Sequence, residues 1–164
     1  MSGRFITRYV TYFKAPISNT EPTVNCTLQE LYKCIREEIP FRELTVQVRM
    51  EMPNEKAYKR AKTTLLPLVT PTGVFTSRNL GGLVALNGLG VLDFDHLESM
   101  EAAIKLRDAL FADSRLKVEL AFVSPSGHGV KVFLPYKLNP ELPLKESYRN
   151  SMRSAWEYVR RSMA

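Results

Sequence analysis

Residues 88–99 read GLGVLDFDHLES, and this stretch decides how the second half of the chain folds. An apolar run from Leu89 to Leu92 ends in two aspartates, Asp93 and Asp95, on either side of Phe94. Alternate side chains of a strand share a face, so the two carboxylates belong on one face, with Cα atoms roughly 6.6 Å apart, and Phe94 points into a core. At an effective dielectric constant near 20, two such charges about 5 Å apart repel by roughly 3 kcal/mol. The stretch therefore predicts a buried strand that ends at a site for a cation.

The residues that follow predict a β-α-β-β-α order for the second half. Ser99 is a suitable N-cap for a helix, and residues 117–136 read as two strands joined by a tight turn at SPSGHG. The final helix is predicted by an apolar stripe at helical spacing. The stripe consists of Tyr148, Met152, Ala155, Trp156, Val159 and Met163. This is the order of an RRM-like or ferredoxin-like fold that lacks its last strand, so one edge of the strand with the aspartates is expected to be unpaired or covered by another element.

The first half of the chain predicts a mixed αβ unit. Two strands are expected over residues 4–14 and 43–50, because the first is rich in β-branched and aromatic residues and the second alternates. Two helices are expected, one over residues 26–39 and one that begins at Pro53. Short extended pieces fill the Gly-rich residues 70–88. The fold class is therefore α+β, in a single domain over residues 1–164 with an N-terminal unit (1–87) and a C-terminal unit (88–164).

Composition narrows the class of protein. The chain has 164 residues, 45% hydrophobic and 24% charged, which is ordinary for one globular domain. Residues 1–14 alternate charged and apolar side chains, so we expect no signal peptide there, and no apolar run reaches membrane-spanning length. Cys26 and Cys34 fit neither a metal spacing nor a disulfide framework. A cytoplasmic location is expected. The net charge of +6 permits a polyanionic partner. Part of the excess is local, because residues 145–164 contain five basic residues and only two acidic ones. A solvated helix face would explain that excess equally well.

Three groups of residues are candidates for chemistry. Carboxylates such as Asp93 and Asp95 are hard ligands that suit Mg²⁺ or Mn²⁺ and substrate phosphates, although helix capping and an ion pair are the structural alternative. The turn at residues 124–129 offers exposed N–H groups, a hydroxyl and an imidazole, and with Lys131 it would form a phosphate cradle. Its alternative is a plain hairpin. Arg78, in TSRN, could reach a phosphate or simply face solvent.

Taken in order, these motifs resemble a known family. The segments LDFDHL (92–97) and SPSGHGVK (124–131) look like the first two motifs of the archaeo-eukaryotic primase superfamily, a DxD after hydrophobic residues and a Ser-x-His. With TPTGVFTSRN (70–79), the chain more closely resembles the N-terminal domain family of virulence-associated E (VirE) type proteins. The resemblance implies a primase-polymerase-like fold and metal-dependent nucleotidyl transfer in a replication protein of a mobile element or phage.

The resemblance also implies roles and partners. Asp93 and Asp95 would bind the divalent metals, Mg²⁺ or Mn²⁺. The implied nucleotide and phosphate contacts are Ser126, Gly127, His128, Gly129 and Lys131, with Arg78 as a further contact. The expected partners are a nucleoside triphosphate, a DNA or RNA template or primer, and a helicase domain in a longer chain. No membrane is expected.

The sequence departs from the superfamily at its third motif, an acid on a later strand. After His128 the only acids are Glu141, Glu146 and Glu157, and none lies in a predicted strand. We therefore expect the chain to be truncated at its C-terminus, with catalysis dependent on an acid that the full-length protein supplies. The alternative from another class is a non-catalytic module that binds nucleic acid or nucleotide. A DxD phosphohydrolase is a weaker alternative, because Leu97 stands where that family has Thr or Val.

Overall fold

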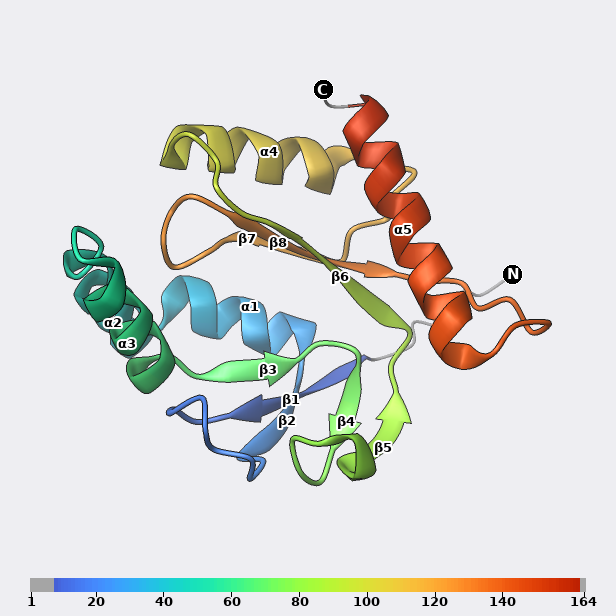
Figure 1. Cartoon of the computed structure of the whole chain (residues 1–164), viewed down its shortest axis with the longest axis horizontal. Coiled ribbons are helices and arrows are strands. Elements are labelled where there is room, and N and C mark those ends of the chain that lie inside the picture. Colours follow the sequence, from blue (N-terminus) through green and yellow to red (C-terminus); the bar gives the residue numbers. More distant parts are fainter. Residues whose placement is uncertain (1–7, 163–164) are drawn as a thin grey trace. The chain divides into compact units, whose positions relative to one another are not determined.

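The computed structural model describes residues 8–162, in which five α-helices and three small antiparallel sheets form a mixed α+β structure (Figure 1). The chain divides into two compact units, Met1–Asn87 and Gly88–Ala164, called below the N-terminal and the C-terminal unit. No helix within residues 8–162 is both long and apolar enough to cross a membrane.

The N-terminal unit contains two sheets and three helices. In the first sheet, β1 (Tyr9–Phe13) lies between β2 (Val24–Thr27) and β3 (Leu68–Thr70). The second sheet pairs β4 (Gly73–Phe75) with β5 (Leu83–Leu86), around the short 3₁₀ helix η1 (Leu80–Gly82). The helices α1 (Leu28–Glu37), α2 (Ile39–Met50) and α3 (Glu55–Leu65) follow one another between β2 and β3. The short extended pieces predicted over residues 70–88 are confirmed.

The strand predicted over residues 43–50 is wrong, because these residues belong to α2. The alternation of Leu44, Val46 and Val48 suggested a strand, but the inward residues of the helix are Phe41, Leu44, Thr45 and Val48, at helical spacing. Pro40 in the first turn favours the helix. Cys26 also lies on β2 and not on the predicted helix, and both cysteines are free thiols.

The C-terminal unit has the predicted β-α-β-β-α order. Its elements are β6 (Leu89–Phe94), α4 (Met100–Ala112), β7 (Leu120–Val123), β8 (Val130–Pro135) and α5 (Leu144–Ser162). The sheet order is β6-β8-β7, so the second strand of the β7–β8 hairpin lies in the centre and pairs antiparallel with both neighbours. As predicted, Ser99 caps α4, because its hydroxyl accepts from Ala102 N.

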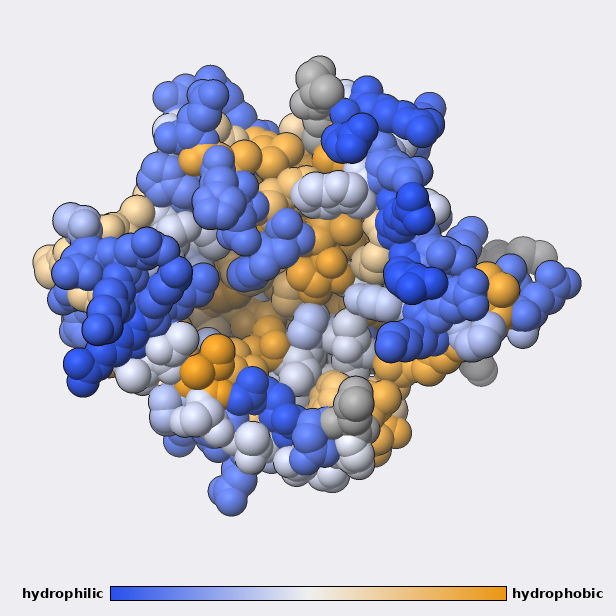
Figure 2. Space-filling view, viewed as in Figure 1, coloured by the Kyte–Doolittle hydropathy of each residue, from blue (hydrophilic) through white to orange (hydrophobic). Residues whose placement is uncertain are grey.

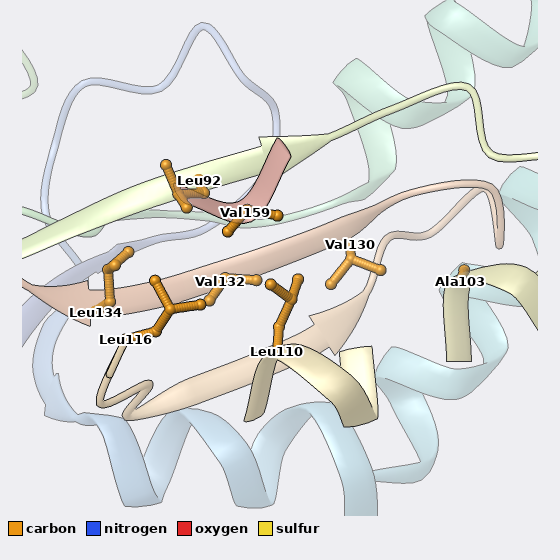
Figure 3. Close-up of a cluster of buried hydrophobic side chains, with 8 residues drawn as sticks. All are labelled: Leu92, Ala103, Leu110, Leu116, Val130, Val132, Leu134 and Val159. Atoms are coloured by element: carbon orange, nitrogen blue, oxygen red, sulfur yellow. The ribbon is translucent and has the colours of Figure 1, made fainter. Parts of the chain in front are cut away.

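The core of this unit lies between one face of the sheet and both helices (Figure 3). Its buried residues are Leu92, Ala103, Leu110, Leu116, Val130, Val132, Leu134 and Val159. The side chains from β8 are alternate residues of the strand, so they share the face that α4 and α5 cover. Val159, Met152 and Ala155 of the predicted apolar stripe contribute to this core, and Met163 lies outside the described residues.

Helix α5 covers part of the outer edge of β6. Gly90 has no side chain where α5 approaches, and a Cβ there would lie 2.1 Å from Met152 Sδ. The backbone of Val91 hydrogen-bonds to the Tyr148 hydroxyl, and this bond opposes the burial that raises the pKa of Tyr148. Within residues 8–162, no strand pairs with β6 on this side, and the strands of the N-terminal unit form their own sheets. Of the two expected outcomes for this edge, the structure therefore shows coverage by another element at Val91.

Candidate functional site

The two aspartates occupy different positions at the end of β6. Asp93 is on the strand, directly opposite Lys131 of β8, and Asp95 follows the strand's last residue. Lys131 Nζ donates to Asp93 Oδ2. The two side chains are 29% and 43% exposed, respectively. The ammonium group of Lys131, on the neighbouring strand β8, thus provides a positive charge beside Asp93.

Phe94 points away from the aspartates, as predicted, and packs against the core. Its ring stacks on that of Trp156 in α5, with centroids 4.7 Å apart and planes 21° from parallel. The contact joins the C-terminal end of β6 to the last turns of α5. The position of the two carboxylates therefore depends on a strand end that is anchored on its opposite face.

Gly129 is the point of closest approach between the end of β6 and the predicted turn. A Cβ on Gly129 would lie 2.6 Å from the Phe94 carbonyl oxygen, 2.9 Å from Ser124 Oγ and 3.0 Å from Asp95 Oδ1. Any larger residue would push these groups apart. Asp95 and the Ser-Gly-His-Gly turn are therefore brought together, although they are more than thirty residues apart in the sequence.

The turn itself is a closed hydrogen-bonded loop. Ser124 N donates to Gly129 O at 2.8 Å, and Gly127 N donates to Ser124 O at 2.9 Å. The hydroxyls of Ser124 and Ser126 are 2.9 Å apart, and Ser126 Oγ accepts from His128 N at 3.2 Å. Gly127 has a φ of +79°, which a side chain would disfavour. The loop thus gathers two hydroxyls, and its last residue, Gly129, lies against Asp95.

The His128 ring is fixed by the segment that follows β6. Its Nδ1 lies 2.9 Å from the Leu97 carbonyl oxygen, and Leu97 N donates to His128 O at 2.9 Å. Because a carbonyl oxygen only accepts, Nδ1 carries the proton in this contact. In the neutral ring Nε2 is then left as an acceptor, and in the charged ring it becomes a second donor.

Arg78 lies in the N-terminal unit, between β4 and η1. Its guanidinium donates to the carbonyl oxygens of Ile17 and of Asn19, the latter at 3.2 Å, and its backbone N–H donates to Thr20 O at 2.9 Å. Arg78 therefore holds the loop after β1. Its expected contact with a phosphate stays a prediction.

Three features of the site were not singled out by the sequence patterns. Ser124 is buried beside Gly129 and carries one of the two paired hydroxyls. Its place as the first Ser of SPSGHG could have identified it as a site residue. The Leu97 carbonyl orients His128 through the backbone, which leaves no residue-type signal. Trp156 was assigned only to the apolar stripe, whereas its ring supports Phe94 and remains 40% exposed.

The donor set can be compared with the needs of a divalent metal. Within residues 8–162, no group of three or more His, Cys, Asp or Glu side chains is placed to hold a metal ion. Mg²⁺ nevertheless needs only one or two carboxylates when water and substrate phosphates complete its shell. Two hard oxygen donors, Asp93 and Asp95, beside a loop of hydroxyls and backbone N–H groups fit that pattern.

The fold and this site define an α+β domain with two acidic residues at a strand end, closed by a Ser-Gly-His-Gly turn. The chain belongs to the family described as BT4734-like, N-terminal domain, whose model matches residues 60–163. The matched segment contains all the candidate residues from Arg78 to Lys131. No curated protein and no solved structure matches the chain.

Proposed function

We propose that the C-terminal unit binds a nucleoside triphosphate with Mg²⁺ or Mn²⁺ and serves metal-dependent nucleotidyl transfer of the primase-polymerase type. The observation that carries the proposal is the contact at Gly129, which brings Asp95 against the Ser-Gly-His-Gly turn. The sheet order β6-β8-β7 also agrees with an RRM-like catalytic unit. The resemblance to VirE-type and primase-superfamily motifs gives the biological setting, a cytoplasmic DNA replication protein of a mobile element or phage that works beside a helicase on a DNA or RNA template.

Each residue of the site has a distinct part in this proposal. Asp93 and Asp95 hold the metal, which when bound would neutralise phosphate charge and lower the pKa of the attacking hydroxyl. Ser126 binds a phosphate through its hydroxyl, because the N–H groups of Gly127 and His128 are already donated within the turn. His128, with Nδ1 held by the Leu97 carbonyl, presents Nε2–H to a phosphate oxygen when the ring is charged. Lys131 moves its ammonium from Asp93 to the phosphate chain as the substrate binds.

One observation favours a second candidate, a non-catalytic module that binds nucleotide or nucleic acid. Lys131 already neutralises Asp93, so this carboxylate has a counter-ion without a metal. In this alternative phosphate binds to the Ser126 hydroxyl and to Lys131, and Asp93 only positions that lysine. The two candidates differ in whether nucleotide binding requires a divalent ion.

The test is calorimetric titration of a nucleoside triphosphate into the protein, once with Mn²⁺ and once with EDTA. The compared variants are Asp93→Asn with Asp95→Asn, and a matched control with Glu101→Gln and Asp108→Asn on α4. The control removes the same charge from exposed side chains whose salt bridges are made with Lys105 and Arg107.

Binding that needs Mn²⁺, is lost in the aspartate variant and persists in the control would support the proposal. Equal binding in EDTA, retained in the aspartate variant, would favour the non-catalytic module. Absence of binding under both conditions in the parent protein would refute the proposed function and the nucleotide-binding form of the second candidate.

A further inference from the structure

Helix α5 has a row of basic side chains along one side. In a helix, residues four positions apart lie on the same side, and so do residues seven positions apart. The members of this row are Lys145, Arg149, Arg153 and Arg160. At 1.5 Å per residue the row extends over roughly 22 Å. It is not the side that packs on the core, since all four residues are exposed.

This basic row, as we call it below, is largely unneutralised. Arg153 Nε pairs with Glu157 Oε1 at 3.1 Å, but both side chains are exposed and such a pair is weak. Lys145, Arg149 and Arg160 form no salt bridge with any residue in the range 8–162. In Figure 2 strongly hydrophilic side chains follow α5 over much of its length. A free cationic row of this kind is suited to an extended polyanion.

An aromatic ring accompanies the basic row. Trp156 comes three residues after Arg153 and four before Arg160, so it lies on the same side of α5. It is 40% exposed, although it stacks on Phe94. A ring that is supported on one face and open to solvent is a platform on which an unpaired base can stack.

We propose that the basic row and Trp156 form a binding track for single-stranded nucleic acid, with phosphates on the arginines and a base stacked on the indole. Single strands are favoured over duplex because stacking on Trp156 requires a base with a free face. An acidic protein segment would satisfy the charges and leave the ring unused.

The track reaches the strand end that carries the candidate site. Trp156 stacks on Phe94, whose side chain lies on the face of β6 opposite that of Asp93. A strand on the track would therefore reach the end of β6 from the face opposite the carboxylates. This last step rests on the proposed function, because only a nucleotidyl-transfer site there would make the strand a template or primer. Binding along α5 itself does not depend on it.

The experiment measures binding of a 5′-fluorescein-labelled oligothymidylate of about 20 nucleotides, long enough to cover the track, by fluorescence anisotropy with the full chain in EDTA. The test variant carries Arg149→Gln and Arg160→Gln. The matched control carries Lys56→Gln and Lys62→Gln on α3, which removes the same charge from another exposed helix. Circular dichroism checks that both variants are folded.

We expect the test variant to bind about tenfold more weakly, and the slope of log K against log[salt] to fall by about 1.4, because two phosphate contacts on a single strand are lost. The control should bind as the parent does. Trp156 is the only tryptophan, so its fluorescence should be quenched saturably by the unlabelled oligonucleotide. Trp156→Leu should weaken binding without changing the salt slope.

Several results would overturn the inference. Equal losses in the test and control variants would show that net charge alone attracts the strand. Binding without quenching of Trp156, or equally tight binding of duplex DNA or poly-glutamate, would show that no base stacks on the helix. Because the assay contains neither nucleotide nor metal, its failure would leave the calorimetric test of the proposed function unaffected.

Discussion

Replacement of Gly129 by alanine tests how closely the turn is pressed against the end of β6. The added methyl group would lie 2.6 Å from the Phe94 carbonyl oxygen, whereas ordinary contact begins at 3.4 Å. The carbonyl would therefore have to retreat by about 0.8 Å, and as a backbone atom it cannot rotate away like a flexible side chain. Overpacking of this kind costs about 1 to 3 kcal/mol, so we expect the free energy of unfolding to fall by about 2 kcal/mol.

The assay is urea unfolding followed by far-ultraviolet circular dichroism, with Gly81→Ala as the matched control. A Cβ on Gly81 would meet only Asn79 Oδ1, at 3.4 Å, so this variant should remain within about 0.5 kcal/mol of the parent. The displacement of Phe94 should also change the emission of Trp156, on which it stacks. A Gly129→Ala protein with parental stability and unchanged emission would refute the tight contact, and with it the geometric basis of the candidate site.

Three further predictions concern the core and two ionisable groups. Leu110→Ala should lower the free energy of unfolding by about 3 kcal/mol, because the Leu110 side chain is fully buried. The neighbouring Phe111 is 58% exposed, so Phe111→Ala should cost less than about 1 kcal/mol. Equal losses of the two variants in urea unfolding would contradict the described core. The hydrogen bond from the Tyr158 hydroxyl holds the pKa of Asp113 below its usual value. The stability that this bond adds is therefore present above the pKa of Asp113 in the unfolded chain, and it is lost as the pH falls through the lower pKa of the folded protein. Tyr158→Phe should therefore cost about 1 kcal/mol near neutral pH, and this difference should narrow in acid; a difference independent of pH would contradict the assignment. Burial raises the pKa of the Cys26 thiol to about 11. Its alkylation rate should therefore still rise about tenfold per pH unit at pH values above the pKa of a free cysteine, which is about 8.5. A rate that reaches a plateau near pH 8.5 would show an unperturbed thiol.

The sequence predicted the C-terminal unit better than the N-terminal one, for a physical reason. In the C-terminal unit, helical periodicity, the Ser99 cap and the Gly-containing turn all favour the same structure, and each prediction is confirmed. In α2 the two signals conflict, because Leu44, Val46 and Val48 alternate while Phe41, Leu44 and Val48 have helical spacing. Burial of one helix face decided the outcome, and a local pattern does not contain that information.

The candidate site shows a similar division. Residue types and turn chemistry predicted the strand end with Asp95 and the Ser-Gly-His-Gly turn separately, and only the family resemblance implied that they share a site. In the structure they meet because they lie at ends of neighbouring strands. The identity of the partner for Asp93 depended on strand register, which puts Lys131 directly opposite. The orientation of His128 depended on a backbone carbonyl, which every residue has. Register and backbone contacts are therefore the parts that a pattern of residue types does not specify.

The ion pair between Lys131 and Asp93 bears on both candidate functions. A partly exposed pair of this kind contributes at most about 1 kcal/mol, so it gives Asp93 a counter-ion that is easily displaced. In the proposed function, a divalent ion that arrived with a nucleotide would bring two charges and additional phosphate oxygens, and it would compete with Lys131 for Asp93. The released ammonium would then be one strand away from the same phosphates. A weak pair of this kind is ordinary for exposed side chains, so it is compatible with both candidates. What separates them is whether nucleotide binding displaces Lys131 from Asp93 only when a divalent ion is present.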